Sequence, residues 1–157
     1  RHKMPKASNN LDLDTHLPAL IQTLGNKISL HALRGGAGSH SLDLREWRII
    51  LILGAEGRST INEVADRVAM DRGGTSRSIS RLEQRGLIER FDDSKDRRRS
   101  LVDLNTTGVS IHKDLVQFSK DREKLILKNV ALTDQKLLNE LLHKLIDNLD
   151  QLLDGSI

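Results

Sequence analysis

The spacing of apolar residues changes between residues 60 and 104, and this change restricts the fold more than any other feature of the chain. The stretch STINEVADRVA has an apolar residue at every third or fourth position, which is the period of a helix. Thr60 followed by Glu63 is a capping-box start for that helix. A second short helix should follow Asp71 and end at Gly86, since glycine suits the position just after a helix. Two short helices with a tight connection form a helix-turn-helix pattern.

Two short β-prone segments follow these helices, LIERF at residues 87–91 and SLVDL at residues 100–104, and together they predict a β-hairpin. The stretch DDSKDRRR before the second segment holds three aspartates and four cations within eight residues. A buried turn is excluded, because unpaired charge is costly away from water. A plain solvent loop would need no run of three arginines, so we expect this loop to touch a partner.

Positive charge is concentrated in the same region. Residues 72–99 hold nine Lys or Arg and five Asp or Glu, a net charge of +4, whereas the whole chain carries only +3. A local basic excess is typical of a protein with a polyanion partner, although a solvated surface can have the same composition. The aromatic residues Trp47, Phe91 and Phe118 are too few for a base-stacking surface, so duplex is favoured over single-stranded nucleic acid.

The second helix of the pair has the composition of a major-groove reader. Ile79 and Leu82 are its apolar anchors, so the opposite side is left to small polar and basic residues. Arginine can pair bidentately with guanine, while Ser and Thr can address bases or phosphates. Gly73 and Gly74 either let backbone N–H groups approach a phosphate or merely form the turn. The candidate DNA contacts of this module are Thr60, Arg72, Gly74, Thr75, Ser76, Arg77 and Arg81.

Beside such a helix, the charged loop would lie over the neighbouring minor groove. A narrow minor groove attracts inserted arginine because its negative potential is enhanced. Asp96 stands two residues before Arg98 and can hold that guanidinium in a fork-shaped ion pair. We therefore expect Arg98 to enter the minor groove, while Arg97 and Arg99 contact the DNA backbone or solvent.

An amphipathic helix is predicted on the N-terminal side of this module. Its apolar stripe runs from Leu17 to Ile28 with the period of a helix. RGGAGS, residues 34–39, interrupts the pattern and is expected to be a flexible break. The next stretch, LREWRIILILGAE, is apolar on nearly all sides, which predicts a buried helix that ends at Gly57.

Two more helices are predicted after the hairpin, the first capped by Asn105 and the last started by Thr133 with Asp134. The apolar stripe of the last helix is too broad for one-sided packing in so small a protein. An exposed patch of this size usually marks a partner surface, so we expect a dimer interface made with the first helix. The alternative is that the last helix folds back on its own core. The interface candidates are Leu17, Leu138, Leu142, Leu145, Leu149 and Leu152.

The stretches EWRIILIL, INEVADRVAMDRGGTSRSISRLEQRGLIER and DRRRSLVDLNTTG resemble the MarR family of bacterial transcriptional regulators. The resemblance is strong from Leu44 to Gly108. Asn105 replaces a threonine of the family's wing signature, and Gly73-Gly74 stand where the family tends to have Ser-Thr, which leaves the base contacts open. The wing-signature positions in this chain are Asp96, Arg98, Leu104, Asn105 and Gly108.

The resemblance implies a mostly α-helical fold with a small β-hairpin wing (α+β), namely a winged helix-turn-helix with N- and C-terminal dimerisation helices. It also implies an obligate homodimer that binds a pseudo-palindromic double-stranded DNA operator. The implied domains are an N-terminal tail at residues 1–10, an N-terminal dimerisation helix at 11–34, a DNA-binding domain at 42–108 and C-terminal dimerisation helices at 109–157.

The function implied by the resemblance is DNA-binding transcriptional regulation, and we expect a repressor. Many members of the family release DNA when a small phenolic or carboxylate effector enters a cleft between the dimerisation and DNA-binding regions. His31 continues the stripe of the first helix and should face inward, and Arg34 could hold a carboxylate. The alternative is that the histidine is merely hydrogen-bonded and that Trp47 belongs to the core. The effector candidates are His31, Arg34, His40 and Trp47.

Other classes of function find little support in the sequence. Cysteine is absent, which excludes disulfides, thiolate metal sites and cysteine nucleophiles. No glycine-rich phosphate loop, nucleophile motif or metal-ligand spacing occurs, so we expect no cofactor, no metal site and no enzymatic activity. No apolar run is long enough for a membrane span, and no signal-peptide pattern is present, so a cytoplasmic protein without a membrane partner is expected. A winged helix that binds an acidic protein remains the competing hypothesis.

Overall fold

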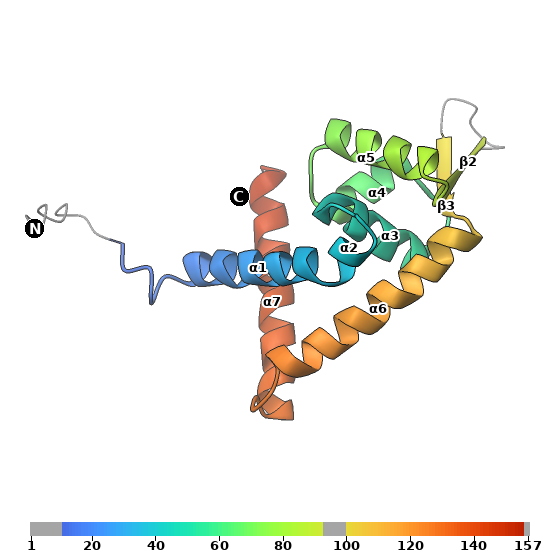
Figure 1. Ribbon diagram of the computed structural model, residues 1–157. Coiled ribbons are helices and arrows are strands. Elements are labelled where there is room, and N and C mark those ends of the chain that lie inside the picture. The colour runs from blue at the N-terminus through green and yellow to red at the C-terminus, as the bar shows by residue number, and fades with distance from the viewer. Residues whose placement is uncertain (1–10, 93–99, 156–157) are drawn as a thin grey trace, which may run out of the picture. The chain divides into compact units, whose positions relative to one another are not determined.

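The computed structural model describes residues 11–92 and 100–155 (Figure 1). The chain divides into two compact units, one that ends at Phe118 and one that begins at Ser119. The fold is mostly helical with a small antiparallel sheet, as the sequence predicts. The elements in chain order are α1 (Leu17–Arg34), α2 (Gly36–Ser39), α3 (Leu44–Glu56), β1 (Ser59–Thr60), α4 (Ile61–Val68), α5 (Arg72–Gln84), β2 (Ile88–Asp92), β3 (Ser100–Leu104), α6 (Thr106–Ile126) and α7 (Leu132–Leu153).

Reciprocal capping boxes begin two of the helices. The box predicted for α4 is present, because the Thr60 backbone N–H donates to the Glu63 carboxylate (2.7 Å) and the Glu63 N–H donates to the Thr60 hydroxyl (3.2 Å). A second box, which the sequence analysis missed, joins Asp43 and Glu46 at the start of α3. Each box satisfies backbone N–H groups that have no partner within the helix.

Glycines end α3 and α5 at the positions predicted for them. Gly57 follows the last residue of α3 with a φ of 76°, and Gly86 follows the C-cap of α5 with a φ of 68°. Both values lie in the left-handed region, where a side chain costs energy and glycine does not. These two residues therefore fix where the chain leaves each helix.

The predicted hairpin is present and gains a third strand. β2 and β3 pair antiparallel, from Ile88 opposite Leu104 to Asp92 opposite Ser100. The two-residue strand β1 pairs with the other edge of β3, so the strand order is β1-β3-β2. β1 is too short to give an alternating pattern, which is why the sequence did not reveal it. Its pairing attaches the start of α4 to the hairpin.

The core of the first unit lies where α3, α4, α5 and the sheet meet. Leu87 and Asn105 join this core to the sheet, because the Asn105 N–H donates to the Leu87 carbonyl (3.2 Å). The Asn105 side chain also caps α6, as predicted, by accepting from the Gly108 N–H (3.0 Å). The largest fully buried apolar side chains are Ile49, Ile50, Leu53, Val64, Ile79, Leu82, Val102 and Leu115.

Two expectations about segment boundaries are wrong. Residues 34–39 do not form a flexible break, because Gly36–Ser39 is the short helix α2 and Ala37 is fully buried. The last helix begins at Leu132 rather than at Thr133, and its N-cap Ala131 makes no side-chain capping bond. In the first case, the burial of Ala37 outweighs the low helix propensity of the glycines around it. In the second case, the helix begins one residue earlier than predicted.

Apolar surface is exposed on the helices at both ends of the chain. In α1, Ala32 is the buried residue, whereas the stripe from Leu17 to Leu24 is open to solvent. In α7 no residue is buried, although leucines recur along its length. Among the described residues, large apolar side chains of both α1 and α7 are therefore exposed.

Candidate nucleic-acid interface

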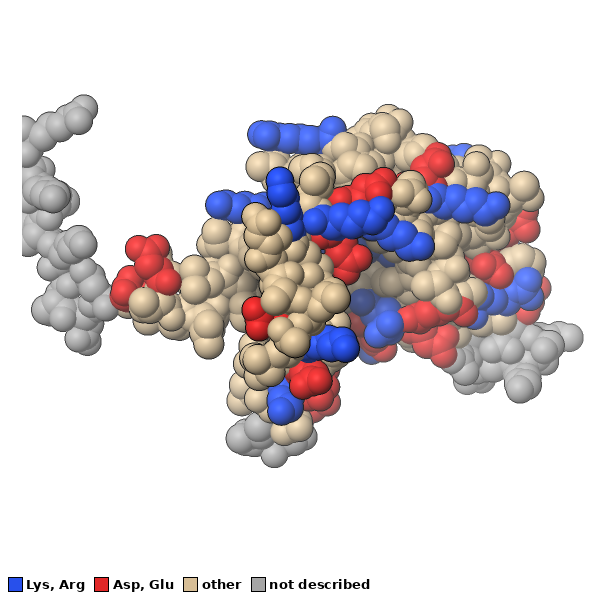
Figure 2. Space-filling model, turned by 90° about the horizontal axis from the view of Figure 1, so that it is seen from below, with Lys and Arg blue, Asp and Glu red and all other residues tan. Residues whose placement is uncertain are grey.

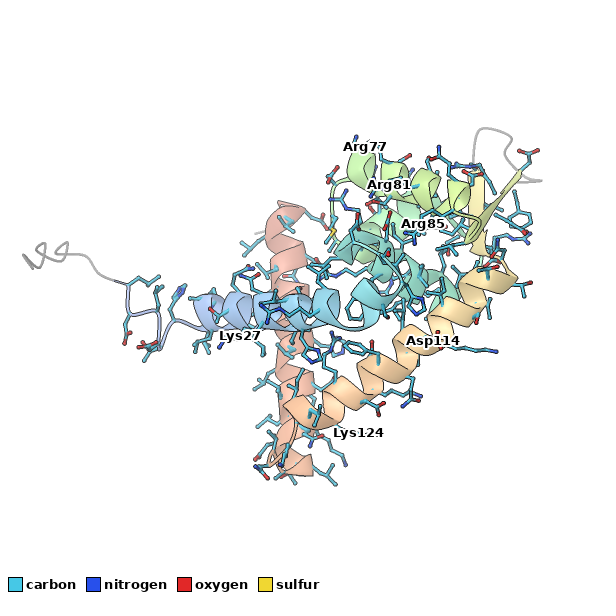
Figure 3. All side chains as sticks on the ribbon, in the orientation of Figure 1. Lys27, Arg77, Arg81, Arg85, Asp114 and Lys124 are labelled. Carbon is cyan, nitrogen blue, oxygen red and sulfur yellow. The ribbon has the colours of Figure 1, made fainter. Side chains whose placement is uncertain are left out.

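The α5 helix presents basic residues along its length. Arg77 and Arg81 lie on α5, and Arg85 is its C-cap residue (Figure 3). Arg77 is exposed and has no hydrogen-bond or ion-pair partner among the described residues. Ser76 beside it is half-buried, and Arg72 at the start of the helix is exposed and pairs with Asp66 (3.3 Å). Of the predicted contacts on α5, Arg77 is therefore the most available to a ligand.

Three of the predicted DNA contacts are engaged inside the protein. Thr75 is fully buried and its hydroxyl donates to the Asp71 carbonyl (3.0 Å), so its expected place on the outer face is wrong. The physical reason is helical geometry, because Thr75 lies four residues before Ile79 and shares its inward face. Gly74 is also buried. Thr60 is buried, and its hydroxyl donates to the Glu63 carboxylate (2.8 Å).

Asp71 fixes the start of α5. Its carboxylate accepts from the Gly74 N–H (2.6 Å) and pairs with the Arg45 guanidinium (2.9 Å). The hydrogen bond from Gly74 lowers the pKa of Asp71 below its ordinary value, and the positive charge of Arg45 lowers it further. The N-terminal end of α5 is thus attached to α3 through one carboxylate and one guanidinium.

A second ion-pair network connects the later part of α5 to the start of α3. Arg81 donates to the Glu46 carboxylate (3.0 Å) and to the Asp43 carboxylate (2.8 Å). The hydrogen bond to Glu46 raises the pKa of Arg81 above its ordinary value. The Glu46 side chain is only 6% exposed and also pairs with Arg85 (3.5 Å). Arg81, which was predicted to contact DNA, therefore has carboxylate partners within the protein.

The hairpin strands have their own cation contacts, which the sequence analysis did not single out. The Arg58 guanidinium lies 3.7 Å from the centre of the Phe91 ring, and its Nε is 3.7 Å from the Asp103 carboxylate. Arg90 pairs with Glu83 of α5 (3.0 Å). These contacts join the sheet to its surroundings. The predicted wing residues Asp96, Arg97, Arg98 and Arg99 lie outside the described residues.

The predicted effector residues gather around an aromatic ring that was not predicted. The His31 ring stacks on Phe118 with centroids 5.4 Å apart, and the Trp47 ring meets Phe118 edge-on at 6.0 Å. His31 is nevertheless exposed rather than inward-facing, whereas Trp47 is buried in the core. A hollow of about 510 Å³ is lined by Arg34, His40 and Phe118 together with Asp114.

His40, on the wall of this hollow, is held by one side-chain contact and one backbone contact. Its Nε2 is 3.4 Å from the Asp114 carboxylate, and its backbone carbonyl accepts from Arg85 (2.8 Å). Gly35 and Gly36 lie against the Phe118 ring, where an added Cβ would collide with it. Asp114 and Phe118 come from α6, far along the chain, so no local sequence signal connects them with residues 31–47.

The surface carries charges of both signs. Figure 2 shows Lys and Arg side chains interspersed with Asp and Glu side chains on the face seen from below. This face therefore has no extended field of one sign. Among the described residues, no group of three or more His, Asp or Glu side chains is arranged to hold a metal ion. None of the described helices combines the length and the apolar character that crossing a membrane requires.

Comparison with known proteins identifies the family. The family model for the MarR family matches residues 40–99. The HTH-type transcriptional regulator FarR of Neisseria gonorrhoeae is 27% identical over 101 residues, which span 64% of this chain and 69% of FarR. A MarR/EmrR family transcriptional regulator from Acinetobacter sp. ADP1 has a similar structure, with a TM-score of 0.81 and 28% identity over 90% of this chain and 99% of that one.

A third similar protein is the transcriptional regulator PcaV of Streptomyces coelicolor, whose structure was solved with its natural ligand. It is 25% identical with a TM-score of 0.74, and the match covers 88% of this chain and 97% of PcaV. Proteins of this kind regulate transcription and are not enzymes. The family match covers the helix-turn-helix and the first hairpin strand, β2, and the structural similarity extends over most of the chain. The chain thus has a MarR-type winged helix, and over residues 40–99 it matches the MarR family of transcriptional regulators.

Proposed function

We propose that the chain is a repressor that binds pseudo-palindromic duplex operators as a homodimer and is released by a small phenolic or carboxylate ligand. In this proposal α5 enters the major groove, and the loop between β2 and β3 reaches the adjacent minor groove. Residues 42–108 form the DNA-binding domain, while residues 11–34 and 109–157 form the dimerisation region. The proposed tail, residues 1–10, lies outside the described residues.

The availability of Arg77 on α5 is the observation that carries the DNA-binding mode. Arg77 is exposed on a helix that is attached to α3 near both ends, so its backbone position is fixed before DNA arrives. A rigid helix with a free guanidinium suits bidentate pairing with guanine in the major groove. Arg72 and Ser76 are suited to contacts with phosphates or bases beside it.

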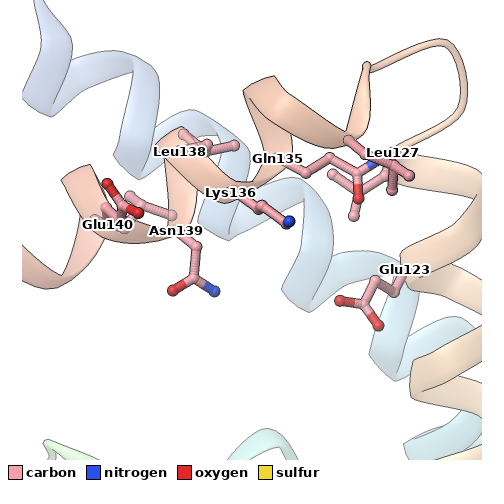
Figure 4. Close-up of a pocket in the computed structure, with 9 residues that line it drawn as sticks. Glu123, Leu127, Gln135, Lys136, Leu138, Asn139 and Glu140 are labelled. Carbon is pink, nitrogen blue, oxygen red and sulfur yellow. The ribbon is translucent and has the colours of Figure 1, made fainter.

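The uncovered apolar sides of α1 and α7 support the homodimer. Leu17, Leu138 and Leu149 are exposed in the single chain, as are the other leucines of both stripes. In the second unit, a hollow of about 520 Å³ lies between the end of α6 and α7, with Leu127 and Leu138 among its lining residues (Figure 4). Apolar patches of this extent are rare on monomers and typical of partner surfaces. The terminal helices of a second copy are the proposed cover.

The hollow beside Phe118 supports a carboxylate or phenolic ligand. Arg34 offers a guanidinium that can pair with a carboxylate, and the Phe118 ring offers an apolar surface for an aromatic ligand. PcaV, which is similar over most of this chain, was solved with its natural ligand. The proposed ligand residues are therefore Arg34 and His40 on the wall of the hollow, with His31 and Trp47 placed around the ring.

Selection of bound DNA from a random duplex pool tests this function. We expect a palindromic consensus, a steep loss of affinity with salt, and about 1–3 kcal/mol of lost discrimination at one base pair per half-site in Arg77→Ala. No enrichment of any duplex sequence would contradict DNA binding and favour the competing role in protein–protein contacts. An equal loss on all sequences in Arg77→Ala would make Arg77 a phosphate contact instead.

A further inference from the structure

A second hollow, of about 430 Å³, lies between the start of α3 and α5. Three arginines from two helices line it, namely Arg45 from α3 and Arg77 and Arg81 from α5, together with Ser78 and the acidic N-cap residue Asp43. Guanidinium groups repel one another, so three of them around one hollow are stable only with carboxylates or another anion nearby. The contacts made by these carboxylates show which N–H donors of the arginines remain available for a ligand.

The carboxylates leave donors free on each of these arginines. Arg81 uses its Nε on Glu46 and its Nη2 on Asp43 and Ser78, which leaves Nη1 without an acceptor among the described residues. Arg45 uses Nη2 on Asp71. The carboxylates hold both side chains in place. Because a guanidinium has five N–H donors, some donors of each side chain remain available for a ligand.

The charge balance around the hollow leaves one positive charge in excess. The ion-pair network at the hollow contains four guanidiniums, those of Arg45, Arg77 and Arg81 on its wall and that of Arg85 outside it, and three carboxylates. The three carboxylates belong to Asp43, Glu46 and Asp71. The excess positive charge of this network favours an anionic partner.

Gly74 explains how Arg45 reaches the start of α5. The Arg45 guanidinium lies directly over Gly74, and a Cβ at this position would overlap it. Any side chain at residue 74 would displace the arginine. The glycine at residue 74 and the position of Arg45 are therefore two parts of one local arrangement.

We propose that Arg45 binds a DNA backbone phosphate beside the N-terminal part of α5, with the free Nη1 of Arg81 facing the same phosphate. The inference rests on the proposed binding of duplex DNA by α5. It adds a contact from α3, outside the helix-turn-helix, and makes Gly74 the residue that leaves room for it. Because a phosphate is common to all operators, this contact strengthens binding without choosing a sequence.

The test is operator binding measured over a range of salt concentrations for Arg45→Gln and for its control Arg48→Gln. Arg48 lies on the same helix, is exposed and has no ion-pair partner among the described residues. We expect Arg45→Gln to lower the salt slope by about 1 per protomer and to leave the preference among operator sequences unchanged. Arg48→Gln should leave the slope as it is in the unmodified protein.

A second set of variants, made in an Asp71→Ser background, distinguishes phosphate binding by Arg45 from a purely structural role through Asp71. Asp71→Ser keeps a capping residue on α5 but removes the carboxylate that Arg45 holds. In that background, Arg45→Gln should still lower the salt slope by about 1 per protomer. If it has no effect there, Arg45 acts only by supporting Asp71 and the inference is wrong. Gly74→Ala, which displaces the guanidinium without removing it, should reproduce the Arg45→Gln loss, and an unchanged slope in Gly74→Ala also contradicts the inference.

A comparison of phosphate and chloride buffers distinguishes binding of a DNA backbone phosphate from binding of a small free anion. At equal ionic strength, phosphate and chloride buffers should give the same operator affinity if the hollow takes the DNA backbone. An Arg45-dependent loss of affinity in phosphate alone would mean that the hollow binds a free anion, which overturns the proposed DNA contact. If the unmodified protein binds no duplex at all, the proposed function fails, whereas DNA binding that is unaffected by Arg45→Gln defeats only this inference.

Discussion

The guanidinium of Arg85, at the C-cap of α5, donates to the backbone carbonyl of His40, 2.8 Å away. The same guanidinium donates to the carbonyl of Ser41 (3.1 Å), a non-glycine residue with a φ of 52°. The side chain of His40 lines the hollow beside Phe118. A ligand that moves this turn would therefore pull on α5 through Arg85, which gives the proposed ligand release a physical route.

Arg85→Gln should uncouple the ligand from DNA. We expect the variant to bind the operator and a phenolic carboxylate such as 4-hydroxybenzoate about as well as the unmodified protein, while the ligand no longer weakens operator binding. Calorimetry of ligand binding and fluorescence anisotropy of a labelled operator provide the two measurements. Gln84→Ala, on the adjacent exposed residue, is the control and should respond to the ligand normally. Full release in Arg85→Gln would remove Arg85 from the route.

Leu142→Asp with Leu145→Asp should convert the proposed homodimer to monomers or to unfolded chain. Both leucines lie on the apolar stripe of α7, and a carboxylate there would be buried without a partner once a second copy covers the stripe. Light scattering at micromolar concentration measures the mass, and circular dichroism reports the helix content. The control is Lys144→Asp, which introduces the same side chain on α7 outside the stripe. A monomeric unmodified protein would contradict the proposed dimer.

The lowered pKa of Asp71 predicts a stability term that depends on pH. Because the folded pKa is below the unfolded one, this carboxylate stabilises the fold above about pH 4, and its contribution is lost as the pH falls through the folded pKa. The free energy of unfolding in urea should therefore be lower in Asp71→Ser than in the unmodified protein at about pH 6. The difference should shrink toward about pH 3. A difference that is the same at both pH values would refute the assignment.

The sequence predicts those parts of the fold that depend on neighbouring residues. The capping box of Thr60 and Glu63, the left-handed Gly86 and the hairpin all follow from local rules, and the structure confirms them. The burial of Thr75 could also have been predicted from the sequence, because Thr75 is four residues before the anchor Ile79 and so lies on the same face of the helix. The prediction that Thr75 faces solvent was wrong because it did not take this spacing into account.

The candidate sites depend on contacts between distant residues, which a single sequence does not reveal. Arg81 and Arg85 reach back by 35 to 45 positions to α3 and the turn before it, so a basic helix that suggests DNA contacts is partly neutralised within the protein. Phe118 completes the hollow from α6, with no spacing that relates it to Arg34. The proposed role of Arg45 depends on the open space above Gly74, which arises from the packing of α3 against α5 and has no signal in the sequence.

The wing arginines give the last prediction, which rests on sequence because residues 93–99 lie outside the described part of the chain. In a hairpin, residues two apart point the same way, so Asp96 can hold Arg98 while Arg97 and Arg99 face elsewhere. Loss of a minor-groove arginine should weaken binding most at A·T-rich flanks, where the groove is narrow. Arg98→Ala should therefore flatten the preference between A·T-rich and G·C-rich flanks, and Asp96→Ala should partly reproduce this effect.

Arg97→Ala is the matched control for this wing experiment, since it removes the same charge one residue away. A lost phosphate contact weakens binding nearly uniformly, so Arg97→Ala should lower affinity and reduce the salt slope by about 1 without changing the flank preference. Each variant is measured against two operators that differ only in the steps facing the wing. If Arg97→Ala and Arg98→Ala behave alike, or if Asp96→Ala strengthens binding by removing a negative charge, the loop is a diffuse basic patch and Arg98 has no special place in the groove.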